Sequence, residues 1–247
     1  GFARRHDGHT GKTAANCAAL LQGGEIRFVQ QKMLLPTYDV FDESRNFAPG
    51  DRQQVWEFAG RRLGVTICED IWNDKQFWER RLYSRDPVEE LVSAGADLLI
   101  NLSSSPYHMH KRRLRRDMLA AIARRHRLPV VLVNQVGGND QLLFDGTSFV
   151  LDAAGEIRAL ARSFEEDLVL YDTDANSGDL HETLSDECEA AYEALVLGAR
   201  DYVRKCGFER VLVGLSGGID SSLTAVIAAD ALGPANVTGV GMPGPYS

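Results

Sequence analysis

Features of secreted and membrane proteins are missing from this sequence of 247 residues. No apolar run is long enough to cross a bilayer, and the first residues contain no signal-peptide hydrophobic segment. Cysteine is scarce and forms no C-x-x-C pair, which favours a reducing compartment over a disulfide framework or a zinc site. We therefore expect a cytoplasmic protein with no membrane partner. The four cysteines are Cys17, Cys68, Cys188 and Cys206.

Positive charge is also in short supply. The net charge is -8, which argues against a general nucleic-acid binder because phosphates are neutralised by a cationic surface. One basic run, residues 111–116, begins a helical stretch with Leu114, Met118 and Ile122 on its apolar side. This pattern favours a solvated basic helix face over an RNA site. We expect small-molecule substrates and no nucleic-acid partner.

The pattern of apolar residues is that of a layered α/β protein. Apolar runs such as Leu98–Ile100 and Val130–Val133 indicate strands that are buried on both faces. Polar residues at Asp172–Asp179 predict a linker, so we divide the chain into residues 1–173, a linker at 174–184, and residues 185–247. Strands are predicted at 25–30, 55–58, 63–68, 97–102, 129–136, 148–152, 156–161, 168–171, 211–215 and 236–242, and helices at 86–94, 111–126, 186–205 and 223–232.

A glycine-rich turn follows the predicted strand Val211–Leu215. The string SGGIDSS at residues 216–222 then leads into an Ala-rich helix. Glycines allow close backbone approach to a ligand, and a helix N-terminus supplies donors and positive partial charge, so phosphate is the expected ligand. The Walker pattern is excluded because no Gly-Lys-Ser/Thr follows the loop.

SGGIDSS resembles the pyrophosphate loop of the N-type ATP pyrophosphatases, which adenylate a carboxyl or carbonyl group. The resemblance implies a doubly wound parallel-sheet domain, of which this chain contains the start. It also implies Mg²⁺, for which Asp220 is the candidate ligand; its alternative role is to cap the following helix. The implied ATP-binding residues are Gly214, Leu215, Ser216, Gly217, Gly218, Ile219, Asp220, Ser221 and Ser222.

A second group of residues surrounds Cys68. This cysteine ends an apolar strand and is followed at once by two acidic residues, which predicts a sharp turn that would expose a nucleophile. Taken alone, a buried packing cysteine would be the better interpretation. Lys32 and Glu43 change this, because a nearby ammonium would lower the thiol pKa and could stabilise an oxyanion.

The strings KMLLPTYDVFDESRNF, GVTICEDIW and NLSSSPYHMHK resemble the nitrilase superfamily, over about residues 1–172. The resemblance implies an α-β-β-α sandwich and an amidase. Cys68 matches the nucleophile, Lys32 the catalytic lysine and Glu43 a supporting glutamate. In glutamine-hydrolysing members, the positions of Tyr38, Ser105 and Lys111 hold the amino-acid part of the substrate.

One departure from the superfamily concerns its general-base glutamate. Glu25 is the only glutamate before Lys32, and its surroundings do not match that motif. We therefore expect an internal fragment of a longer protein that is poorly active or inactive by itself.

Together the two halves resemble the glutamine-dependent NAD synthetase family, to which residues 230–243 are also similar. Members release ammonia from glutamine and use ATP to amidate deamido-NAD, yielding NAD, AMP and pyrophosphate, and they form homo-oligomers. Two alternatives remain open. One is a stand-alone nitrilase-type amidase or carbamoylase without ATP dependence, and the other is a non-catalytic nucleotide-binding remnant.

Overall fold

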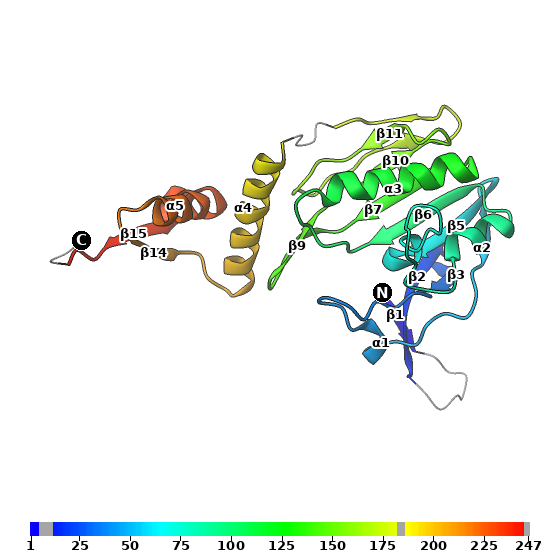
Figure 1. The fold of residues 1–247 in the computed structure, drawn as a ribbon, viewed down its shortest axis with the longest axis horizontal. Coiled ribbons are helices and arrows are strands. Elements are labelled where there is room, and N and C mark those ends of the chain that lie inside the picture. The colour runs from blue at the N-terminus through cyan, green and yellow to red at the C-terminus, as the bar shows by residue number, and fades with distance from the viewer. Residues whose placement is uncertain (5–11, 182–185, 245–247) are drawn as a thin grey trace.

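The computed structural model describes residues 1–4, 12–181 and 186–244. A six-stranded mixed sheet lies at its centre, in the order β11-β10-β7-β6-β5-β4, with helix α3 across one face (Figure 1). The three middle strands, β5, β6 and β7, are parallel, and the outer strands join antiparallel. The bounds are β4 Val55–Phe58, β5 Arg61–Ile67, β6 Leu98–Ser103, β7 Val130–Asn134, β10 Phe149–Leu151, β11 Ile157–Leu160, α2 Pro87–Ser93 and α3 Lys111–His126.

The main core lies between this sheet and helices α2 and α3. Its largest members are apolar side chains of the helices and the parallel strands, so the predicted layered α/β architecture is confirmed. The prediction that the apolar runs are buried on both faces is wrong at Val133, which is 47% exposed; Leu102, which lies beyond the run Leu98–Ile100, is 39% exposed. These two residues line a cavity on the face opposite α3.

A second, antiparallel sheet packs against that opposite face. It contains β1 (Phe2–Arg4), β2 (Ala14–Gln22) and β3 (Glu25–Gln31), and it contacts β5 through Ala18, which joins Val65 and Ile67 in a small buried cluster. The sequence pattern does not predict β2, because the alanines of AANCAALLQ carry little preference for a strand. The short helix α1 (Glu43–Asn46) follows this sheet.

Part of the predicted linker is instead a small hairpin at the edge of the large sheet. β12 (Tyr171–Asp172) pairs with β13 (Ser177–Gly178), and the backbone of Leu160 bonds to both Asp179 and His181. The polar residues that suggested a linker form the hairpin turn. Residues 182–184 of the predicted linker lie outside the described residues. The predicted strand at 168–171 is wrong except for Tyr171.

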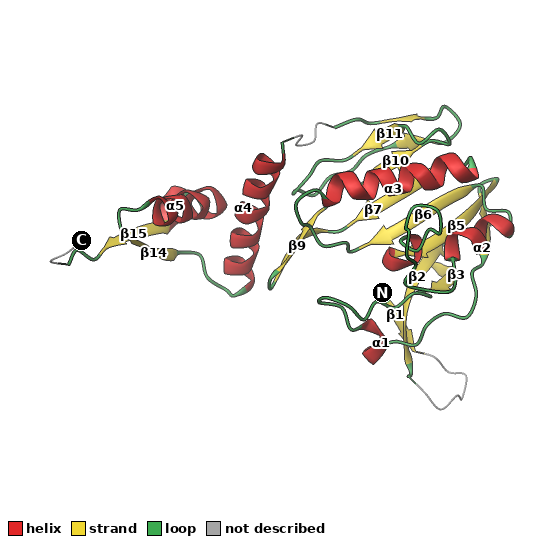
Figure 2. Ribbon diagram, viewed as in Figure 1, coloured by secondary structure: helices red, strands yellow, loops and turns green. Residues whose placement is uncertain are grey.

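The C-terminal part is one β-α-β unit, as predicted. β14 (Val211–Leu215) and β15 (Val237–Gly241) are parallel, and α5 (Ile219–Leu232) connects them. Figure 2 shows this unit separated from the large sheet by helix α4 (Glu187–Lys205). No helix in the described part of the chain has the length and apolar character to cross a membrane.

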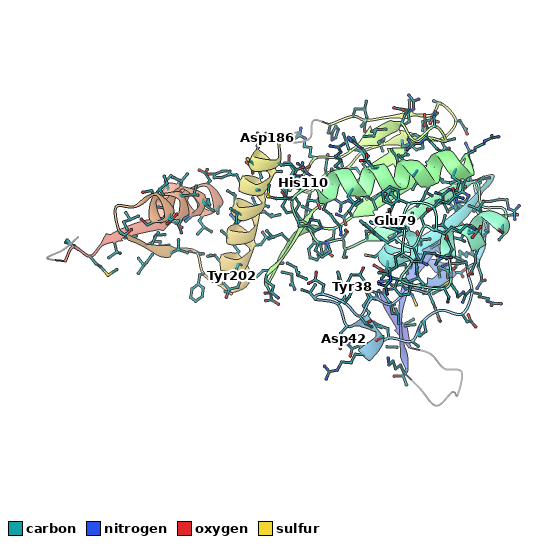
Figure 3. All side chains as sticks on the ribbon, in the orientation of Figure 1. Tyr38, Asp42, Glu79, His110, Asp186 and Tyr202 are labelled. Atoms are coloured by element: carbon teal, nitrogen blue, oxygen red, sulfur yellow. The ribbon has the colours of Figure 1, made fainter. Side chains whose placement is uncertain are left out.

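Helix α4 docks against a hairpin formed by β8 (Val136–Asn139) and β9 (Leu142–Asp145), which projects from the end of β7. The small residue Gly198 permits this contact, because a Cβ there would lie 2.7 Å from a Leu143 methyl group. Figure 3 shows Asp186 and Tyr202 at opposite ends of α4, with His110 near the first. At that end, Glu187 accepts a hydrogen bond of 3.0 Å from the His110 N–H.

The basic run on α3 is not a fully solvated face. Arg115 is 1% exposed and forms a 2.5 Å ion pair with Asp145, which is itself completely buried. The Arg112 side chain is only 10% exposed and lies 3.6 Å from Glu187. The prediction was wrong for these two residues because β9 and α4 supply carboxylates that the helix sequence alone does not reveal.

Removing Arg115 should destabilise the fold strongly. Arg115→Ala leaves the Asp145 carboxylate buried without its ion-pair partner, so we expect the free energy of unfolding to fall by about 3–5 kcal/mol. The matched control is Arg113→Ala, because Arg113 is largely exposed and pairs with Asp117 at the surface. This control substitution should lower the free energy of unfolding by less than about 0.5 kcal/mol. Urea unfolding measures both, and equal losses would contradict a buried pair.

Candidate active site

Cys68 lies in a strained turn at the end of β5. Its backbone φ is +45°, and residues Cys68–Ile71 form a single 3₁₀ turn. The predicted sharp turn at the end of this strand is therefore confirmed. A positive φ is unfavourable for a residue with a Cβ, so surrounding bonds must hold it. Asn101 donates to the Cys68 carbonyl at 3.4 Å, and Asp70 accepts from the Ile67 N–H at 3.1 Å.

A buried lysine, Lys32, and a partly buried glutamate, Glu43, form an ion pair beside this turn. The Lys32 Nζ lies 2.5 Å from Glu43 Oε1, and the lysine side chain is 1% exposed. Lys32 directly follows β3, and Glu43 begins α1, so both residues come from the smaller sheet and its following loop. A buried ammonium is tolerated here because its partner carboxylate compensates the charge.

The structure brings Cys68, Lys32 and Glu43 together around one cavity of about 480 Å³. The cavity lies between the two sheets, so its walls come from both. Glu43 is the one carboxylate among the described residues that line it. The remaining lining residues are Gly1, Asn16, Cys17, Ala18, Phe41, Ile67, Leu102, Ser103, Ser104, Val133, Asn134, Gln135 and Phe144.

Opposing effects set the ionisation of Cys68. The residue is partly exposed, but its thiol is enclosed, and this burial raises the thiol pKa. The Lys32 ammonium, the Ser104 N–H and the Ser103 hydroxyl favour the thiolate, whereas the Glu69 carboxylate disfavours it. The cation and the two donors therefore partly offset the desolvation that a closed cavity imposes.

The three residues predicted to hold glutamine surround the cavity without lining it. The Tyr38 hydroxyl donates to both Glu69 oxygens, at 2.9 and 2.8 Å. The Lys111 ammonium lies 4.5 Å from the centre of the Trp72 ring, and burial lowers its pKa while the charges of Cys68 and Glu69 raise it. Ser105 is buried and donates its N–H to Asn134 at 3.0 Å.

Four residues that organise the site were not predicted from the sequence. Glu69 and Asp70 are buried carboxylates next to Cys68, Asn101 braces the turn, and Ser104 donates to the thiol. The adjacent acidic pair in the string CED could have drawn attention, since two carboxylates directly after an apolar strand are expensive to bury. Asn101 and Ser104 carry no such signal.

The glycine-rich loop between β14 and α5 forms an open concave turn. Gly217 has φ +85°, with nothing within 4 Å of the position a Cβ would take, so a phosphate could approach the backbone. Ser216 and Ser221 are joined by a 3.1 Å bond between their hydroxyls. Gly218 is the N-cap of α5, so the alternative role of Asp220 as that cap is wrong.

Asp220 lies in the first turn of α5 and is exposed. In the part of the chain that the structure describes, no three acidic, histidine or cysteine side chains gather as a metal cage. A lone carboxylate beside a phosphate loop nevertheless fits Mg²⁺, which takes most of its other ligands from water and phosphate oxygens.

Two family models match this chain. The model described as carbon-nitrogen hydrolase matches residues 1–180, and the model described as NAD synthase matches residues 191–247. The first covers the two sheets and the cavity, and the second covers most of α4 and the glycine-rich loop.

Several known proteins are similar over nearly the whole chain. A glutamine-dependent NAD(+) synthetase of Synechocystis sp. is 46% identical over 94% of this chain, which spans 42% of that protein. The structure of the Acinetobacter baumannii glutamine-dependent NAD+ synthetase in complex with ADP superposes with a TM-score of 0.86 at 41% identity, covering 98% of this chain and 44% of that one.

A carbon-nitrogen hydrolase of Helicobacter pylori superposes with a TM-score of 0.56 at 27% identity, covering 67% of this chain and 57% of that one. The cysteine, lysine and glutamate around the cavity thus lie within a region that matches this family in both sequence and fold. From the match of its residues 1–180, the chain belongs to the carbon-nitrogen hydrolase family.

Proposed function

We propose that this chain carries the glutamine-hydrolysing site and the ATP loop of a glutamine-dependent NAD synthetase. The observation that carries the proposal is the cavity in which Cys68 meets the Lys32–Glu43 ion pair, in a chain that also contains the SGGIDSS loop. A stand-alone amidase would need the cavity but not the SGGIDSS loop. The similarity to NAD synthetases extends over both.

Glutamine hydrolysis would begin with attack of the Cys68 thiolate on the side-chain amide carbon. A carbon–sulfur bond forms, the carbonyl oxygen becomes an oxyanion, and the Lys32 ammonium is placed to stabilise it. The carbon–nitrogen bond then breaks, and the nitrogen takes up the proton that the Cys68 thiol lost on ionising and leaves as ammonia, with the glutamyl group held as a thioester. Glu43 orients the Lys32 ammonium through their 2.5 Å contact.

The charges beside the cavity suit an amino acid substrate. Glutamine carries an ammonium and a carboxylate at the end opposite its side-chain amide. Glu69 supplies a buried carboxylate, and Lys111 supplies a half-buried ammonium whose pKa that carboxylate raises. We propose that they, with Tyr38 and Ser105, hold the two charged ends of glutamine. A neutral amide without these two charged groups would make neither ion pair.

Ammonia would then be used at the second site. ATP bound by residues 214–222 adenylates the nicotinate carboxylate of deamido-NAD, and ammonia displaces AMP to form the amide of NAD. Mg²⁺, held in part by Asp220, would neutralise charge on the phosphates when bound. We further propose a cytoplasmic homo-oligomeric enzyme that acts on small molecules and has no nucleic-acid partner.

The reactivity of Cys68 should depend on Lys32. In Lys32→Ala the thiol loses the cation that opposes the effect of burial, so its pKa rises and less thiolate is present at neutral pH. We expect labelling by a glutamine analogue that bears a diazoketone to slow by about tenfold or more, since each pKa unit is a factor of ten. Peptide mass spectrometry measures the rate at each cysteine.

Cys188 and Cys206 provide internal controls because both are exposed. Their labelling should be slow and unaffected by Lys32→Ala. Equal labelling of the three cysteines, or the same rate at Cys68 in both proteins, would contradict an assembled amidase site.

Steady hydrolysis of glutamine should be slow in residues 1–247. Glu43 is already engaged by Lys32 and is the one carboxylate lining the described cavity, so a separate general base is not supplied. We expect acylation of Cys68 to exceed turnover, measured as covalent adduct against released ammonia. Rapid turnover would show that Glu43 or Glu69 acts as the base.

ATP binding should depend on Gly217. Gly217→Ala places a Cβ on a left-handed residue at the loop, which costs about 1–2 kcal/mol and obstructs phosphate approach. Gly207→Ala is the matched control, because Gly207 also has a positive φ and open surroundings but lies after α4. Titration calorimetry with MgATP should show at least about a tenfold loss of affinity for Gly217→Ala alone. Equal affinities would argue against a phosphate loop.

A further inference from the structure

The Asp70 carboxylate lies between the two strand ends that carry the nucleophile and the lysine. Oδ1 accepts the N–H groups of Met33 and Leu34, at 3.0 and 2.8 Å, directly after Lys32. Oδ2 accepts the N–H of Ile67 at 3.1 Å, directly before Cys68. One buried side chain thus accepts hydrogen bonds from the backbone next to Lys32 and from the backbone next to Cys68.

This link matters because the two strand ends belong to different sheets. β3, which ends before Lys32, lies in the three-stranded sheet, and β5, which ends before Cys68, lies in the six-stranded sheet. Within the described ranges, no strand ladder fixes their separation. The sheets contact each other by side-chain packing, which tolerates shifts that directed hydrogen bonds do not.

We propose that Asp70 is a positioning residue that holds the Lys32 ammonium against the Cys68 thiol by tying the ends of β3 and β5 together. It touches neither the cavity nor the reacting atoms, so its effect must pass through these two residues. The bond that its carboxylate accepts from the Ile67 N–H also stabilises the positive φ of Cys68, since it fixes the residue immediately before the turn.

The cost of this arrangement supports a functional reason for it. Burial raises the pKa of Asp70 to about 6, although the three N–H donors and Lys32 lower it. An apolar residue at this position would avoid that cost but would leave three backbone donors without an acceptor. Protonation would likewise convert one carboxylate oxygen into a donor and remove part of the link.

The test is the pH dependence of alkylation at Cys68 in Asp70→Asn, with iodoacetamide as the probe. The charged or titratable groups around the thiol are Lys32, Glu43, Glu69, Tyr38, Lys111 and Cys17. Of these, Lys32 directly precedes the backbone N–H groups of Met33 and Leu34 that Asp70 binds. An amide has a single acceptor oxygen, so its NH₂ group would face a donor. We expect the alkylation midpoint to rise by about one pH unit and the rate at pH 7 to fall about tenfold.

Asp152→Asn is the matched control. Asp152 is also a buried carboxylate that accepts two backbone N–H bonds, from Ala154 and Glu156, but it lies in the β10–β11 turn. This variant should lose stability without moving the midpoint. An unchanged midpoint in folded Asp70→Asn, or an equal shift in Asp152→Asn, would overturn the proposal.

A double-mutant cycle tests whether the effect passes through Lys32. In the Lys32→Ala background, Asp70→Asn should change the alkylation rate by less than about twofold, because the cation that it positions is absent. A tenfold effect of Asp70→Asn both with Lys32 present and in the Lys32→Ala background would overturn the proposal. If Asp70→Asn does not fold, Asp70→Glu replaces it; this variant keeps the charge but displaces it, and a wild-type midpoint there would also overturn the proposal.

The role of Asp70 in catalysis rests on the proposed function, but the test does not. Iodoacetamide reads the thiol whether or not glutamine is the substrate. Failure to form a glutamyl adduct at Cys68 with a normal Asp70 effect would contradict the proposed function alone, whereas normal adduct formation with no Asp70 effect would contradict this inference alone.

Discussion

The ion pair between Lys32 and Glu43 is the interaction on which the candidate site depends. The lysine side chain is 1% exposed, and its charge is compensated by the Glu43 carboxylate at an Nζ–Oε1 distance of 2.5 Å. The same ammonium opposes the effect of burial on the Cys68 thiol. The cavity can therefore enclose the Cys68 thiol and still allow it to ionise to the thiolate that would attack an amide.

The architecture places this pair where two sheets meet. The large sheet supplies Cys68 at the end of β5 and the cavity wall at the ends of β6 and β7, whereas the small sheet and its following loop supply Lys32 and Glu43. Side chains rather than strand ladders join the two halves, which explains why buried polar residues such as Asp70 and Gln30 bond to backbone across them. The polar residues are therefore part of the fold as well as of the site.

Helix α4 contacts both the part of the chain before it and the part after it. It packs on the β8–β9 hairpin through Gly198 and Leu143, and on α5 of the glycine-rich loop unit. The same hairpin contributes Phe144 to the cavity wall and Asp145 to the pair with Arg115. The region matched by the carbon-nitrogen hydrolase model and the region matched by the NAD synthase model thus share a packed boundary.

Much of this arrangement could be predicted from the sequence. The apolar strands β4 and β14 and helix α3 have the predicted bounds, and motif resemblance brought Cys68, Lys32 and Glu43 into one hypothesis. Strand β2 was missed because its alanines carry no strand signal, and the burial of Arg115 was missed because its partner lies 30 residues away. Contacts of that kind depend on how elements pack. The domain boundaries and the roles of the site residues stay predictions.

The most direct measurement is the mass of the protein after brief incubation with isotopically labelled glutamine and an acid quench. The account predicts a glutamyl group attached through a thioester to the peptide that contains Cys68, together with release of one ammonia per adduct. Absence of the adduct under conditions where the protein is folded, or its attachment to Cys17, Cys188 or Cys206, would contradict the assignment of this cavity as an amidase site.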